Sequence, residues 1–315
     1  MRYSIRHVTR FTYESPITES VMETRMQPRG DDLQRCLHFA LVTNPTSRVM
    51  VYQDHDGNTV HHFDIPGRHS RLTVTADAVV ECLPSTTLPH RLGPGAWAQL
   101  DALVASGEAW EYSAPSQFVL QSEALDAFRR EIRLDRGHDP LVTLRWLMGE
   151  MYARFEYSPR STRVDSPIEK ALAARRGVCQ DFAHIFLALV RPLGIPARYV
   201  SGYLFREVGS SDRSSDGATH AWVEARLPDL GWVGFDPTNN LIAEDRHVRV
   251  AIGRDYADVP PTRGVFKGVS AVRSELGVSV RVGPARSPAS SEVLPFTPWM
   301  SRDATEPVRE SDAQQ

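Results

Sequence analysis

Three residue types that together support nucleophilic catalysis stand in separate segments of the chain: Cys179, His220 and Asp236. A thiolate is a strong nucleophile, a neighbouring imidazole accepts the thiol proton, and a carboxylate orients that imidazole and supports its positive charge. The three can act together only if the fold brings them to one place. The elements that carry them decide whether it does.

Cys179 lies where a glycine-marked loop turns into an apolar segment. Phe182, Ile185, Phe186 and Leu189 recur at helical spacing, which predicts a helix that begins at the cysteine and buries one face. The free N–H groups and the dipole of a helix N-terminus favour a negative charge, and hence a thiolate. A buried cysteine acting as a small hydrophobe fits this segment equally well.

His220 and Asp236 belong to a predicted β-hairpin. Strand-like runs at 219–227 and 231–236 flank a three-residue connection, which pairs Leu227 with Gly231 and Trp222 with Asp236. His220 and Asp236 then lie on one side of the sheet as diagonal neighbours, within reach of a hydrogen bond. A slip of one residue in register would turn Asp236 to the other face. Taken singly, the two residues also fit a buried structural histidine and a turn carboxylate.

The rest of the chain divides into three regions. Residues 1–90 read as short strands with a period of two, and Asp56-Gly57 marks a hairpin turn, which together predict an antiparallel β-sandwich. Residues 91–284 alternate helices and strands and form the predicted catalytic domain. Residues 285–315 are rich in Ser and Pro, without periodicity, and are predicted to be a disordered tail.

Helical spacing in the second region predicts four helices before the cysteine helix, at 97–104, 123–132, 140–155 and 167–175. The last would be capped by Ser166, with Pro167 at its first position. Its expected role is to hold the loop that delivers Cys179.

Composition limits the classes of partner. The 315 residues are 41% hydrophobic and 24% charged, with a net charge of −3, which is typical of a globular protein and argues against a nucleic-acid or membrane partner. Three widely spaced cysteines form no disulfide framework, and no signal-peptide pattern opens the chain. A cytoplasmic location is the expectation, and the oligomeric state is left open.

The segments around the three residues resemble the motifs of bacterial transglutaminase-like proteins. They read GVCQDFAH at 177–184, GIPARYVSGY at 194–203, THAWVE at 219–224, GWVGFDPTN at 231–239 and GRDYADVPP at 253–261. The resemblance implies an α+β fold with a papain-like core, in which the cysteine helix packs on an antiparallel sheet after an N-terminal β domain. It also implies that Cys179, His220 and Asp236 form the catalytic triad.

The expected reaction is acyl chemistry at an amide of a peptide or protein substrate, through a thioester on Cys179. Hydrolysis is the first expectation because no feature shields the thioester from water, and transfer to an amine, which cross-links proteins, is the alternative. Gln180, Trp222 and Tyr256 are candidates for the oxyanion site or the substrate cleft, although packing explains Trp222 as well.

Two other classes stay open. The fold could serve as a non-catalytic protein-binding module, although an intact triad argues against it. A metal site using Cys179, His184, His220 and Asp236 is disfavoured because zinc sites need more cysteines or closer pair spacing. No cofactor and no metal are therefore expected.

Overall fold

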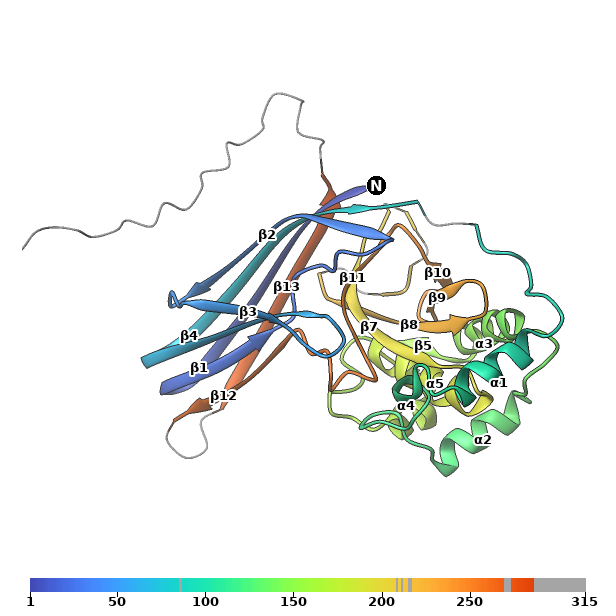
Figure 1. Cartoon of the computed structure of the whole chain (residues 1–315). Coiled ribbons are helices and arrows are strands. Elements are labelled where there is room, and N and C mark those ends of the chain that lie inside the picture. Colours follow the sequence, from blue (N-terminus) through green and yellow to red (C-terminus); the bar gives the residue numbers. More distant parts are fainter. Residues whose placement is uncertain (85–86, 208, 211, 215–216, 269–272, 286–315) are drawn as a thin grey trace, which may run out of the picture. The chain divides into compact units, whose positions relative to one another are not determined.

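The structure is a computed structural model that describes residues 1–84, 87–207, 209–210, 212–214, 217–268 and 273–285 (Figure 1). Residues 1–285 form one compact unit. Apart from Ala285, the predicted tail at 285–315 lies outside the described residues.

A six-stranded antiparallel sheet is built around two long strands, β1 (Arg2–Thr24) and β4 (Thr59–Cys82). The strands β2 (Gln34–Asn44) and β3 (Val49–Gln53) pair with β4. Buried and exposed side chains alternate along much of β1 and β4, with the predicted period of two. The turn between β3 and β4 is the predicted one, and Gly57 supplies its positive φ of 71°.

The other two strands of this sheet come from the far end of the chain. β12 (Thr262–Lys267) and β13 (Ser274–Pro284) both pair with β1. The antiparallel, strand-rich N-terminal region is as predicted, but its six strands are joined in one sheet, and β12 and β13 contribute to it rather than to the core. Local sequence carries no sign of this, because these strands pair with residues at the opposite end of the chain.

The core contains a second antiparallel sheet with the order β10-β9-β8-β7-β11. Its strands are β7 (Ala197–Leu204), β8 (His220–Leu227), β9 (Gly231–Asp236), β10 (Leu241–Ala243) and β11 (His247–Gly253). The sheet curls, so that Ala243 of β10 packs against a buried cluster of Val200, Trp222 and Ile252. A separate pair of short parallel strands joins β5 (Glu156–Tyr157) to β6 (Arg176–Gly177).

The helices lie together beside this sheet (Figure 1). They are α1 (Ala96–Ala105), α2 (Glu123–Glu131), α3 (Pro140–Arg154), α4 (Ile168–Ala174) and α5 (Cys179–Val190), with short 3₁₀ turns η1 (Trp110–Tyr112) and η2 (Arg191–Leu193). All the predicted helices are present, with ends displaced by no more than one residue. The Ser166 cap was wrong, because its hydroxyl instead accepts a hydrogen bond from the Arg163 N–H, in the turn before α4.

The helix that carries Cys179 is enclosed on all sides. Every residue from 180 to 190 is buried, because α5 contacts β7 and β8 on one side and α2, α3 and α4 on the other. The prediction of a single buried face was therefore wrong. A helix that is buried all round is a central element of its domain.

Two amide side chains of the N-terminal region, one on β2 and one in the turn before β4, cap the open edge of β11. Gln34 exchanges two hydrogen bonds of 2.8 Å with the backbone N–H and C=O of Arg249. Asn58 makes the same pair of bonds, also at 2.8 Å, with the backbone of Ile252. Each amide thereby takes the place of a neighbouring strand and satisfies buried backbone groups at the sheet edge.

We expect Asn58→Ala to lower the free energy of unfolding by about 2–5 kcal/mol, because it leaves a buried N–H and a buried C=O of Ile252 without partners. Urea unfolding followed by circular dichroism measures the change. Met50→Ala, at an exposed position of β3, is the control and should change stability by less than about 0.5 kcal/mol. Equal curves for the two variants would contradict the role of Asn58.

Candidate active site

Cys179 is the first residue of α5 and is half-buried. Val178 precedes it in an extended conformation, and its N–H donates to Oδ2 of Asp181 at 2.8 Å. This bond fixes the path by which the chain enters the helix. The first N–H groups of an α-helix have no acceptor within the helix and present a positive potential. The thiol therefore sits where the fold stabilises a negative charge.

The loop between β5 and α4 is tied to the start of α5 at two points. The Thr162 hydroxyl donates to Oδ2 of Asp181, and Nε2 of Gln180 donates to the Val164 carbonyl at 2.8 Å. Gln180 is buried, and one of its amide N–H groups is committed to this loop. The structure thus gives Gln180 a definite role in holding the loop beside Cys179.

The hairpin that carries the histidine and the aspartate has the predicted register. Leu227 pairs with Gly231 and Arg226 with Trp232 across the three-residue connection. His220 and Asp236 fall on the same side, and Nε2 of His220 donates to Oδ2 of Asp236 at 2.8 Å. The predicted hydrogen bond is confirmed.

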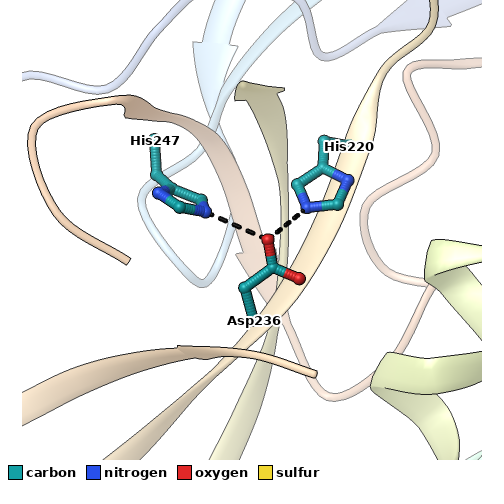
Figure 2. A group of neighbouring side chains, drawn as sticks. All are labelled: His220, Asp236 and His247. Atoms are coloured by element: carbon teal, nitrogen blue, oxygen red, sulfur yellow. Dashed lines mark hydrogen bonds and ion pairs between the residues drawn. The ribbon is translucent and has the colours of Figure 1, made fainter. Parts of the chain in front are cut away.

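Asp236 is fully buried and surrounded by donors. Its Oδ1 accepts from the backbone N–H groups of Thr238 and Asn239 at 3.0 and 3.2 Å. Its Oδ2 accepts from Nδ2 of Asn239 at 2.8 Å. The same oxygen accepts from Nε2 of His247 at 3.2 Å and from His220, as Figure 2 shows. Burial favours the neutral acid, but the charge of His220 and these bonds outweigh it and hold the pKa of Asp236 well below its usual range. The residue is a buried anion.

His220 is equally buried and carries the matching charge. Burial opposes its protonation, but the charge of Asp236 and the hydrogen bond to it, with a smaller contribution from Cys179, raise the pKa of His220 to about 10. Its Nδ1 has no hydrogen-bond partner of ordinary length among the described residues. Cys179 is the neighbouring thiol, and Nδ1 is therefore the nitrogen that can exchange a proton with it.

Of the remaining candidates, Trp222 packs on His220 and Tyr256 lies beside His184. Trp222 is fully buried, with its ring centroid 6.0 Å from that of His220, so it packs behind the histidine and is not accessible to a substrate. Tyr256 is half-buried, and its backbone N–H donates to Nε2 of His184 at 3.2 Å. Burial lowers the pKa of His184 to about 3, so this histidine is neutral and structural.

The four residues considered from the sequence as a metal site do not come together in the structure. Among the described residues, Cys179 and His184 share no cluster of potential ligand atoms with His220 and Asp236. A metal reading that needs all four residues therefore finds no support in their geometry.

Three residues at the site were not singled out from the sequence. His247 and Asn239 both donate to Asp236. Tyr199 lies near Cys179: burial raises the pKa of Tyr199, and the negative charge of a Cys179 thiolate raises it further. Asn239 follows Asp236 by three positions, so its place in the turn could have been noticed. His247 reaches the site only through the curl of the sheet.

The ion pair makes stability depend on pH. The pKa of His220 is raised, so its contribution is complete below the unfolded value of about 6.5 and is lost as pH rises toward about 10. The pKa of Asp236 is depressed, so its contribution is present above about pH 4 and is lost on acidification. We expect the difference in unfolding free energy between wild type and Asp236→Asn to be largest between about pH 5 and 6.5, and to shrink toward pH 10. Denaturant titrations across this pH range measure the difference. A difference that grows toward pH 10 would contradict the charges assigned to His220 and Asp236.

Comparison with known proteins gives the family. A model of the bacterial transglutaminase-like N-terminal region matches residues 3–81, and a model of the transglutaminase-like superfamily matches residues 132–237. An uncharacterized protein of Mycobacterium leprae is 33% identical over 284 residues, which cover 89% of this chain and 98% of the relative. The chain belongs to the transglutaminase-like superfamily and carries the N-terminal region of its bacterial members.

Two further proteins are similar to this chain. A crystal structure from Cytophaga hutchinsonii, whose name proposes a cysteine protease, matches with a TM-score of 0.70 at 19% identity and covers 92% of each chain, which confirms the mixed fold of antiparallel sheets and few helices. A protein-glutamine gamma-glutamyltransferase of Pseudomonas aeruginosa is 31% identical over 123 residues, which cover 36% of this chain and 18% of that protein. Within the described ranges, none of the helices has the length and apolar character needed to cross a bilayer.

Proposed function

We propose that this protein is a thiol-dependent enzyme that transfers acyl groups from amides, with water as the main acceptor, and that Cys179, His220 and Asp236 are its catalytic residues. One observation carries the proposal. A buried His220 is bonded through Nε2 to the Asp236 anion, while its Nδ1 makes no hydrogen bond to any other described residue and lies beside Cys179 at a helix N-terminus.

In the proposed reaction the proton of the Cys179 thiol already lies on Nδ1 of His220 in the resting enzyme, and the thiolate sulfur attacks the amide carbonyl carbon. The tetrahedral intermediate collapses as the C–N bond breaks, and the imidazolium returns the proton to the leaving nitrogen. Water then attacks the thioester with His220 as the base, which releases the acid and restores the thiol. Asp236 keeps the proton of His220 on Nε2, so that Nδ1 is the nitrogen that exchanges protons.

The oxyanion of the intermediate needs donors aimed at the carbonyl oxygen. The backbone N–H of Cys179, in the first turn of α5, is the first of them. Trp222 is not one, because its side chain is fully buried behind His220.

Hydrolysis is proposed ahead of transfer to an amine because a dilute amine competes with water only where the thioester is shielded. Trp222, the aromatic residue next to His220 in the hairpin, is fully buried and offers no such shield. Transamidation of protein glutamine is the second candidate, and it is favoured by the similarity to the gamma-glutamyltransferase over 123 residues.

Mass spectrometry of a peptide mixture incubated with the enzyme, with and without a small primary amine, tests the proposal. Cleaved peptide bonds or deamidated glutamines identify hydrolysis, and peptides joined to the amine identify transfer. Cys179→Ala should abolish every such product, while Cys36→Ala, at the other half-buried cysteine, should retain them. A wild-type protein that yields no product dependent on Cys179 would favour the non-catalytic binding module.

A further inference from the structure

A second imidazole shares the carboxylate oxygen that His220 uses. His247 is buried at the start of β11, and its Nε2 donates to Oδ2 of Asp236 at 3.2 Å from the side opposite His220 (Figure 2). The ring centroids of the two histidines are 6.1 Å apart. Asp236 thus lies between two imidazoles, of which only His220 belongs to the proposed triad.

The hydrogen bonds define the protonation of this group. Oδ2 has no proton to give, so both histidines must carry hydrogen on Nε2. Burial lowers the pKa of His247 even though Asp236 opposes this effect, and Arg246 and His220 add to the lowering. His247 is therefore a neutral donor, and the positive charge of the cluster belongs to His220.

The position of His247 is fixed from two directions. Its backbone belongs to β11, which pairs with β7 at Leu204, and its own N–H donates to the Glu244 carbonyl at 3.0 Å. Two residues further along, the backbone of Arg249 is held by Gln34 of the N-terminal sheet. The N-terminal sheet thereby restrains the strand from which His247 reaches Asp236.

We propose that His247 is a positioning residue for the acyl-transfer reaction: its Nε2–H holds Oδ2 of Asp236 in line with Nε2 of His220, and so keeps Nδ1 of His220 directed at Cys179. This inference rests on the proposed function. A buried carboxylate that loses one donor rotates toward another or admits water, and either change moves Oδ2 off that line.

A purely structural role predicts something different. The ring of His247 also packs against Trp222, with centroids 5.2 Å apart at 71°, and this contact alone could explain an imidazole there. The two roles are separable by substitution. His247→Gln keeps a side-chain N–H donor without the ring, whereas His247→Phe keeps the ring without the donor.

The test is the rate at which iodoacetamide alkylates Cys179, measured from pH 4 to 10 in wild type and both variants by peptide mass spectrometry, with circular dichroism as the check on folding. This readout needs no substrate and reports the thiolate supported by His220. We expect H247F to slow alkylation at pH 6 by on the order of tenfold and to move the rise in rate to higher pH, and H247Q to stay within about threefold of wild type with an unshifted profile.

The other outcomes overturn the inference. A folded H247Q as slow as H247F, or an H247F like wild type, shows that Nε2–H donation is not what matters. If H247F does not fold, H247Q alone decides, since a folded but slow H247Q contradicts the donor role. A wild-type Cys179 that reacts only at the pH of an unactivated thiol, about 8.5, contradicts the proposed function itself, which separates the two failures.

Discussion

Cys179→Ala is expected to lower the rate of the acyl-transfer reaction by at least about a thousandfold, since the other two thiols, Cys36 and Cys82, lie on β2 and β4 and not beside His220. Stability should change little, because the thiol is half-buried at the first position of α5 and alanine is a good helix former. Hydrolysis of a small activated ester, followed by its chromophore, measures the rate. The melting temperature is recorded on the same samples.

Cys36→Ala is the matched control for this change. Cys36 is also half-buried, but it lies on β2 of the N-terminal sheet and its thiol donates to the carbonyl of His38. Its variant should keep the wild-type rate. Equal rates for Cys179→Ala and wild type would place the chemistry elsewhere in the molecule.

Asp236→Asn is expected to lower the rate by about a thousandfold or more, through the tautomer of His220. Five N–H groups from four residues donate to Asp236, and two of them, on His220 and His247, do so at Oδ2 alone. An amide has only one oxygen, so in Asp236→Asn the NH₂ group takes the place of one carboxylate oxygen. Where it replaces Oδ2, it faces the Nε2–H groups of His220 and His247 and cannot accept from them. His220 then accepts on Nε2, its proton moves to Nδ1, and Nδ1 can no longer take the proton of Cys179.

Asp139→Asn tests whether any buried carboxylate in the core would behave in this way. Asp139 is buried and its Oδ1 accepts from the N–H groups of Leu141 and Val142, as the N-cap of α3. Asparagine is an equally good N-cap, so stability and rate should both stay near wild type. If Asp236→Asn loses stability but keeps its rate, Asp236 is a structural residue and not part of the catalytic group.

The hairpin and the cysteine helix could be predicted because their signals are local. The three residues between Leu227 and Gly231 fix the register of β8 and β9, and the register alone puts His220 and Asp236 on one side. The apolar spacing after Cys179 likewise fixes the start of α5. The resemblance to transglutaminase-like proteins then supplied the packing of that helix on the sheet.

Long-range contacts account for what could not be predicted. β11 pairs with β7 across a gap in the sequence, and the sheet must curl before His247 can reach Asp236. A side chain at position 202 would not fit beneath β11, because a Cβ atom on Gly202 would come within 2.1 Å of the Val248 carbonyl oxygen. The capping of β11 by Gln34 and Asn58 is equally non-local, because each amide bonds to backbone groups 194 or more positions away.

The central claim is that His220 activates Cys179 to form a thioester. The most direct measurement is the mass of the intact protein and of its Cys179 peptide after brief exposure to p-nitrophenyl acetate and an acid quench. We predict one acetyl group on Cys179 in the wild type, removable by hydroxylamine, and none in His220→Ala under the same conditions. An acetyl group on Cys179 at the same rate in both proteins, or none in the wild type, would contradict the account.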